Sequence, residues 1–263
     1  MKAEWIADAA RFPPSSSPDL LEIFPTPVLV FRWTEAERRK AEIVAAIRQR
    51  QRESRGIVRT NRNGWHSEID LPAWPEPAVQ ALTRWTASCT QAASLNQCRA
   101  GEPVPFGAWR MNGWANVNPP GGYNELHHHA SRNWHWSACY YVELGDIPAD
   151  AAGGALIFEE RGTGLIPAGS RSPRTCRFVP SEGQVVIFPS WLHHRVEPHL
   201  AGDDRISIAF NLHNAALERS RLWEHRPTWA WRTFPHLMRR VAAWRGKPDE
   251  GRNAVPPGTD ITL

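Results

Sequence analysis

The chain has 263 residues, a formal net charge of +4 and 41% hydrophobic residues, which is enough apolar material for a sizeable buried core. Its mean hydropathy of −0.48 and the lack of any apolar run of about 18 residues exclude a transmembrane helix. The charge is also too small for a nucleic-acid-binding protein, which needs a dense basic face. We expect partners of other kinds, with no membrane and no nucleic acid among them.

The N-terminus reads MKAEWIADAARFPPSSS, with acids and prolines where a secretory signal peptide needs a basic and then an apolar stretch. The four cysteines form no CxxC pair and are too few for a disulfide scaffold. We therefore expect free thiols, a cytoplasmic location, and a loose N-terminal segment over residues 1–21.

An apolar run behind a proline turn predicts a strand within residues 22–33. A helix is expected next over residues 34–53, with Thr34 and Glu37 forming a capping box at its start. A second helix is expected over residues 76–94, with a proline in its first turn. Its apolar stripe has helical spacing and consists of Val79, Leu82, Trp85, Cys89 and Ala93.

From about residue 106 to 214, short apolar runs alternate with turns rich in Gly, Pro and Asn, which is typical of an antiparallel sandwich or barrel. The runs are WRMNGWANVN, HWSACYYVEL, GGALIFEE, TCRFVP, GQVVIFPS, HHRVEP and RISIAFNLH. The pattern stops at Ala215, and residues 215–263 form a Trp- and Arg-rich extension. We interpret this extension as a lid over the barrel, a subunit interface of a homodimer, or a helix lying on the domain.

Histidines cluster in two of these strand-rich segments. His127 and His129 are two residues apart, so in an extended segment they share one face and can chelate one metal ion, while His128 points away. A third ligand is available in His193 or His194. Three such ligands leave the open coordination positions that a catalytic metal needs. The alternative is a polar, His-rich loop that binds no metal.

An HxH pair alone is also compatible with a cupin or a zinc hydrolase. Gly121 followed by five residues and HHH fits the start of the cupin pattern, but the glutamate expected after it is absent. Arg205 stands eleven residues after His194, at the start of RISIAFN. An inward arginine in a metal-binding barrel favours an anionic co-substrate, because guanidinium pairs with carboxylates in a bidentate manner. The alternative is a surface salt bridge.

Four segments, NPPGGYNELHHH, GGALIFEE, PSEGQVVIFPSWLHHRVEP and GDDRISIAFN, resemble the Fe(II)/2-oxoglutarate-dependent oxygenases of the prolyl-hydroxylase-like branch. The likeness is strongest to a group with HxH and FPSWLxHxV motifs, and covers residues 22–214 as one domain. It implies a mainly β fold with supporting helices (residues 34–94) and a barrel core (residues 106–214). That core would be a double-stranded β-helix, a cupin-like jelly roll.

The resemblance implies iron held by His127, His129 and His194, with Arg205 on the distal carboxylate of 2-oxoglutarate. Asn118 stands where related hydroxylases have a tyrosine that touches the co-substrate, which makes it a second candidate contact.

Four further residues are weaker candidates. Asn116, on the same strand face as Asn118, and Ser137 are further candidate cofactor contacts, and Ser137 and Tyr141 are expected to line the pocket. The sequence departs from the family's usual two-His-one-carboxylate set, because a histidine replaces the carboxylate. Glu125 is the reserve ligand, since it stands two residues before His127.

The implied reaction hydroxylates an unactivated C–H bond of an amino acid, peptide or small metabolite and releases succinate and CO2. It requires Fe(II), 2-oxoglutarate and O2, with ascorbate as an optional reductant. The alternatives are a three-His dioxygenase of cupin type that does not use 2-oxoglutarate, and a metal-binding module without catalysis.

Overall fold

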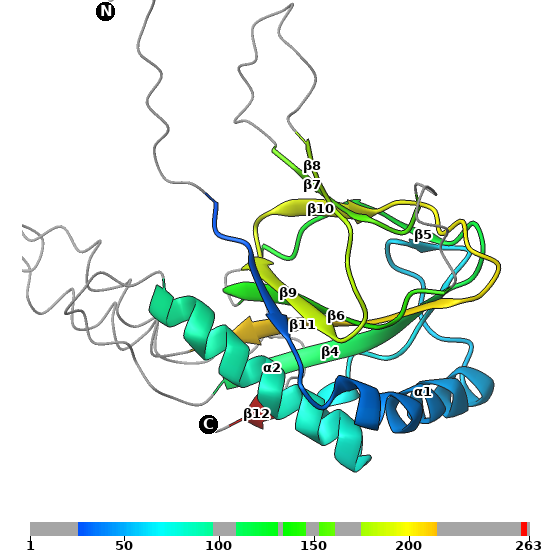
Figure 1. Cartoon of the computed structure of the whole chain (residues 1–263), viewed down its shortest axis with the longest axis horizontal. Helices are drawn as coiled ribbons and strands as arrows, with labels where there is room; N and C mark the ends of the chain where they lie inside the picture. Colours follow the sequence, from blue (N-terminus) through cyan, green and yellow to red (C-terminus); the bar gives the residue numbers. More distant parts are fainter. Residues whose placement is uncertain are drawn as a thin grey trace, which may run out of the picture.

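The structure is a computed structural model that describes residues 26–96, 109–130, 134–145, 153–160, 175–214 and 259–261. Two helices and two antiparallel sheets form the described part of the chain (Figure 1). The proposed N-terminal segment lies outside it, as does the C-terminal extension apart from one strand.

The larger sheet has seven strands. Their order is β1 (Leu29–Arg32), β9 (Gln184–Pro189), β6 (Trp136–Glu143), β11 (Arg205–His213), β4 (Trp109–Asn118) and β12 (Thr259–Ile261), with β3 (Trp65–His66) also beside β4. The smaller sheet has five, in the order β2 (Asn61–Arg62), β5 (Tyr123–His127), β10 (His193–Val196), β7 (Leu156–Glu159) and β8 (Thr175–Phe178). All seven runs predicted as strands form strands.

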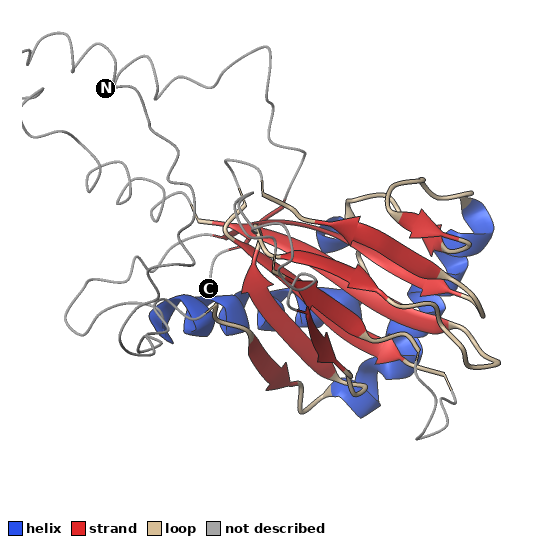
Figure 2. Ribbon diagram, turned by 90° about the horizontal axis from the view of Figure 1, so that it is seen from above, coloured by secondary structure: helices blue, strands red, loops and turns tan. Residues whose placement is uncertain are grey.

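The helices α1 (Ala36–Glu53) and α2 (Pro77–Asn96) lie on the outer face of the larger sheet, opposite the smaller sheet (Figures 1 and 2). The predicted capping box is wrong, because α1 begins after Thr34, and the residue at its N-cap is Glu35, which makes no side-chain cap. The Glu35 carboxylate instead pairs with the arginines at positions 38 and 39, one turn into the helix.

The start of α2 is stabilised by α1. The backbone N–H of Ala78 donates to the carboxylate of Glu42 at 2.9 Å, which supplies a partner for one of the amides that a helix N-terminus leaves unpaired. Arg50 and Glu76 form a further ion pair between the helices at 2.9 Å. The predicted apolar stripe of α2 faces the sheet, with Val79 and Leu82 fully buried.

Strand β11 shows how the larger sheet divides its residues between two environments. Alternate residues of a strand point to opposite faces. One set is apolar and belongs to the core between sheet and helices: Ile206, Ile208, Phe210 and Leu212. The other set faces the smaller sheet and is mostly polar: Arg205, Ser207, Ala209, Asn211 and His213. Strands β4 and β6 alternate in the same way, so the main apolar core lies under the helices, while both polar and apolar side chains line the space between the sheets.

Between the two sheets lies a second, smaller apolar cluster, made of Tyr141, Leu156, Phe158, Val186, Phe188 and Leu192. Cys89, Cys139 and Cys176 form no disulfide. No helix in the described part of the chain is long and apolar enough to cross a membrane.

We predict that stability resides in the core under the helices. Leu82→Ala should lower the free energy of unfolding by about 2–5 kcal/mol, because the fully buried side chain leaves a cavity. Leu95→Ala, on the same helix but 41% exposed, is the matched control and should cost less than about 1 kcal/mol. Urea unfolding measures both, and equal losses would contradict this division.

Candidate active site

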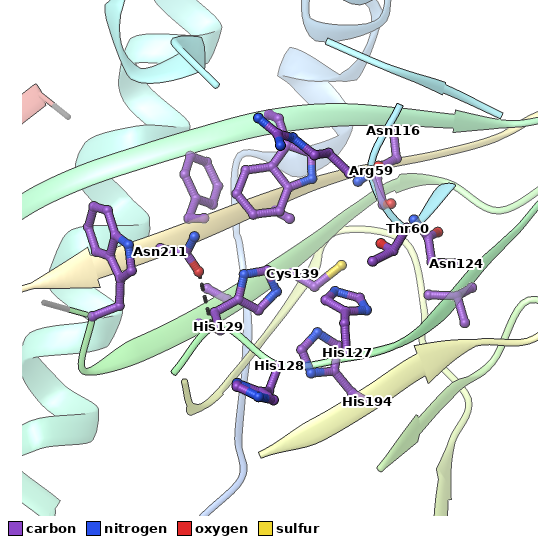
Figure 3. A pocket seen from close by; sticks show the side chains of 18 of the residues that line it. Arg59, Thr60, Asn116, Asn124, His127, His128, His129, Cys139, His194 and Asn211 are labelled. Atoms are coloured by element: carbon purple, nitrogen blue, oxygen red, sulfur yellow. Dashed lines mark hydrogen bonds between the residues drawn. The ribbon is translucent and has the colours of Figure 1, made fainter. Parts of the chain in front are cut away.

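Three histidines meet at the pairing of β5 with β10. His127 ends β5 and lies opposite His194 of β10 in the register, and His129 follows two residues later. One ring nitrogen from each lies within 4.8 Å of the other two, close enough for one ion to reach all three with small side-chain movements. Figure 3 shows the three rings turned toward one another between the sheets.

A bulge in β5 selects the residues that face this cluster. His194 pairs with His127 but Val196 pairs with Asn124, so β5 has one more residue than β10 across the same stretch. Such a bulge interrupts the alternation of side chains. As a result Asn124 and His127 both line the cavity, and Glu125 does not share their face. Glu125 is exposed and pairs with an arginine of β2, so the expectation that it shares the inward face of His127 is wrong.

Backbone carbonyls orient two of the rings. The Nδ1 atoms of His127 and His194 lie 2.6 Å from the carbonyl oxygen of Glu125 and 2.9 Å from that of Leu192, respectively. A carbonyl only accepts, so each Nδ1 carries the proton and donates. The neutral ring then has its lone pair on Nε2, the arrangement that metal-binding histidines adopt.

Burial keeps these rings uncharged. It lowers the pKa of His127 below the usual histidine range, that of His129 well below it, and that of His194 to about 3. The neighbouring histidines oppose protonation further, since a second positive charge beside the first is repelled. At neutral pH the cluster therefore offers three neutral nitrogen ligands.

Two neighbouring histidines, His128 and His193, lie outside the three-histidine cluster. The sequence left open whether His193 or His194 is the third ligand, and the structure brings His194 into the cluster. His193 instead contacts the exposed His128, with ring centroids 4.6 Å apart. The His128 ring points away from the cluster in Figure 3, as its spacing from His127 predicted.

Aromatic rings form the apolar surroundings of the cluster. Phe188 meets His194 edge-on at 4.8 Å between ring centroids. Trp114 lies 5.5 Å from His129 on one side and stacks on His66 at 5.2 Å on the other. The sequence analysis missed Phe188, although alternation within GQVVIFPS puts it on the same face as Val186, toward the smaller sheet.

The cluster opens into a cavity of about 440 Å³, within the range of small-molecule sites. Beyond the histidines and Phe188, its described lining contains Arg59, Thr60, Ile69, Asn112, Trp114, Asn116, Asn124, Ala130, Trp134, Ser137, Ala138, Cys139, Leu156, Val196, Ser207, Ala209, Phe210 and Asn211. No aspartate or glutamate occurs among these described lining residues.

Arg205 is a buried cation without a carboxylate partner in the described part of the chain. It is only 1% exposed, and its Nη1 donates to the hydroxyl of Ser207 at 3.1 Å. Its Nε and Nη2 have no hydrogen-bond partner among the described residues. The nearby Tyr141, with its ring centroid 5.3 Å from the guanidinium carbon, has a buried hydroxyl that also lacks one. An unpaired buried charge is costly, so these atoms fit an incoming anion.

Gly154 allows the backbone to approach this arginine closely. Its φ is +66°, and a Cβ there would lie 3.3 Å from Cδ of Arg205. A side chain at this position would be strained by the backbone conformation and would crowd the guanidinium stem.

The three other residues predicted to contact the co-substrate differ in whether they line the cavity. Asn118 is the register partner of Arg205, but it is not among the cavity's lining residues, and its amide donates to Asn124 at 3.4 Å. Asn116 does line the cavity, with its carbonyl oxygen unpartnered among the described residues. Ser137 lines the cavity as well, but it donates to Asn211 at 3.1 Å, several residues along β11 from Arg205.

Comparison with protein families gives one match. Residues 112–211 match the family described as "Putative 2OG-Fe(II) oxygenase". The matched segment runs from β4 to β11 and contains the three clustered histidines and Arg205. No curated protein sequence matches the chain.

Solved structures share the fold at low sequence identity. A prolyl-4-hydroxylase from Pseudomonas putida is 19% identical, with a TM-score of 0.50 over 72% of this chain and 93% of its own. The carbocyclase SnoK and the epimerase SnoN, both non-heme alpha ketoglutarate dependent enzymes of nogalamycin biosynthesis, are 12% identical. Their TM-scores are 0.52 and 0.53, over 72% of this chain and 80% and 78% of theirs. The predicted double-stranded β-helix is thereby confirmed.

We predict that acid destabilises the metal-free protein through the buried histidines. A histidine whose pKa in the folded protein lies below its unfolded value near 6.5 contributes fully to folding stability above that pH. The contribution is lost as the pH falls toward the folded pKa. The total loss is about 1.4 kcal/mol for each pH unit by which folding lowers the pKa. With chelator present, the free energy of unfolding should fall below about pH 6.5. The fall should be shallower in His194→Gln than in the exposed control His128→Gln. Parallel pH profiles for the two variants would contradict the assignment.

Proposed function

We propose that the chain is an Fe(II)- and 2-oxoglutarate-dependent hydroxylase of the 2OG-Fe(II) oxygenase family, whose description residues 112–211 match. The observation that carries the proposal is the combination of three neutral histidines with a buried Arg205 whose Nε and Nη2 lack partners among the described residues. The first group fits a divalent cation and the second fits a carboxylate.

The metal would be held by Nε2 of His127 and His194 and by a ring nitrogen of His129. Imidazole is a suitable ligand for iron, and three such ligands leave open positions. The backbone carbonyls behind His127 and His194 would keep those two rings in the metal-binding tautomer. Because all three ligands are neutral, the described site itself leaves the charge of the cation uncompensated.

2-Oxoglutarate would supply the missing negative charge. Its distal carboxylate would accept hydrogen bonds from Nε and Nη2 of Arg205 and from the hydroxyl of Tyr141, the donors that lack partners among the described residues. Ser207 would hold the guanidinium in place through Nη1. Tyr141 is not among the cavity's lining residues, contrary to expectation, and in this proposal it contacts the co-substrate instead. Asn118 lies beside Arg205 in the register and makes no direct contact with the co-substrate.

When bound, iron and 2-oxoglutarate together supply oxidation by O2, in which the co-substrate is converted to succinate and CO2 while a C–H bond of the substrate is hydroxylated. The residues of the chain bind and shield. Phe188 and Trp114 exclude water on two sides of the histidines, and Arg205 fixes one end of the co-substrate, which orients its other end. The substrate is an amino acid, a peptide or a small metabolite.

Anaerobic titration with Fe(II) and then 2-oxoglutarate tests the proposal through the visible charge-transfer band of a keto-acid chelate on iron. Wild type should form the band. His194→Ala should lose iron binding and therefore the band. Arg205→Ala should keep iron but bind 2-oxoglutarate roughly ten- to a hundredfold more weakly, because it loses charge-assisted hydrogen bonds. His128→Ala is the matched control and should behave as wild type.

Two results would overturn the proposal in different ways. Iron binding without any band in wild type would favour a three-His dioxygenase that does not use 2-oxoglutarate. Absence of iron binding in wild type would favour a module without catalysis.

A further inference from the structure

Three polar side chains form a row across the inner face of the larger sheet. Asn211 of β11 lies opposite Asn112 of β4 on one side and opposite Ser137 of β6 on the other. All three are at least 95% buried, and all three line the cavity. Directly paired residues of neighbouring strands have adjacent side chains, so these three side chains can contact the same part of a ligand.

The row lies on the far side of the histidines from Arg205. Asn211 is six residues along β11 from Arg205, a distance of roughly 20 Å at about 3.4 Å per residue. The four carbon–carbon bonds of 2-oxoglutarate, each about 1.5 Å long, cannot cover that distance. Trp114, which contacts His129, pairs with Ala209 between the two ends. Figure 3 shows Asn211 on one side of the cluster and Asn116 and Asn124 on the other.

One hydrogen-bonding group of the row has no partner within the described residues. Ser137 donates to Oδ1 of Asn211 at 3.1 Å, whereas Oδ1 of Asn112 is buried and lacks a partner there. A buried carbonyl oxygen left without a hydrogen bond is unfavourable and is normally satisfied. Because it accepts, its complement in a ligand is an N–H or O–H group.

The surroundings of the row restrict the charge of that group. Trp114 and Trp134 line the same cavity, and Trp134 is itself buried. Among the described lining residues there is no aspartate or glutamate to pair with a cationic amine. A buried cation without a partner is strongly disfavoured. A neutral N–H donor such as an amide therefore matches better than an ammonium group.

We propose that Asn112, Asn211 and Ser137 form the substrate-recognition subsite and that it binds an amide group. The substrate is then a neutral amide, either a peptide bond or a carboxamide, whose N–H donates to Oδ1 of Asn112. The inference rests on the proposed function, because it takes the histidines as the metal centre and the Arg205 end as the place of the co-substrate.

The experiment uses the full chain loaded with Zn(II) and 2-oxoglutarate, so that binding is measured without turnover. The probe for a peptide bond is N-acetyl-leucine N-methylamide, and the probe for a carboxamide is isovaleramide. N-acetyl-leucine methyl ester lacks one amide N–H, and isoamylamine is a cation of similar size. Saturation-transfer NMR gives the dissociation constant of each probe.

We expect at least one amide to bind and isoamylamine not to bind. Preference for the N-methylamide over its ester identifies a peptide-type substrate, whereas binding of isovaleramide alone identifies a carboxamide. Asn112→Leu, of similar size but without a hydrogen-bonding group, should weaken the bound amide about tenfold. Asn112→Gln keeps a neutral side-chain carbonyl and should bind the amide more tightly than Asn112→Leu does. Gln49→Leu removes the amide of an exposed residue of α1, which is not among the cavity's lining residues, and is the matched control.

The inference is overturned if neither amide binds, if isoamylamine binds as well as the amides, or if Asn112→Leu binds them as wild type does. The Fe(II) charge-transfer band, recorded on the same preparations, separates this failure from failure of the proposed function. A wild-type protein that forms the band but binds no amide refutes the amide subsite alone. A protein that forms no band refutes the proposed function itself.

Discussion

The pairing of β5 with β10 is the contact on which the rest of the site depends. It places His127 opposite His194, although the two are far apart in sequence, and the chain immediately after β5 brings His129 to the same point. The bulge in β5 then directs Asn124 inward and leaves Glu125 outside with an arginine of β2. A regular ladder would have presented a carboxylate beside the histidines, so one extra residue in one strand determines the charge of the ligand set.

A cavity lined by this many polar groups needs its stability from elsewhere in the fold. The apolar core lies between the helices and the outer face of the larger sheet, and the cluster between the two sheets is much smaller. Burying the Arg205 guanidinium and Oδ1 of Asn112 and Asn116 without full hydrogen-bond partners among the described residues is unfavourable, and the core under the helices offsets that cost. The buried groups that cost stability in this cavity are the same groups that a ligand would satisfy.

The sequence predicted most of the fold and the identity of the three clustered histidines. Both helices and all seven strand runs were predicted because hydrophobic periodicity reports local burial. Short strands such as β2 and β3 lack enough residues to show a period. The position of Glu125 was predicted wrongly because a bulge depends on pairing between distant strands, which one strand's own residues do not reveal. Asn112 and Asn211 were missed although they alternate with apolar residues, since their pairing across strands required the register.

Even-numbered and odd-numbered residues of β11 lie on opposite faces of the strand. The even-numbered positions belong to the core under the helices, although Phe210 also reaches the cavity, and the odd-numbered Ser207, Ala209 and Asn211 line the cavity. Sequence changes confined to odd positions could therefore alter what the cavity accepts while the scaffold stays intact, and changes at even positions would act in the opposite way. Deletion of a single residue within the strand would exchange the two sets. It would direct isoleucines into the cavity and a charged guanidinium under the helices, and so abolish scaffold and chemistry together.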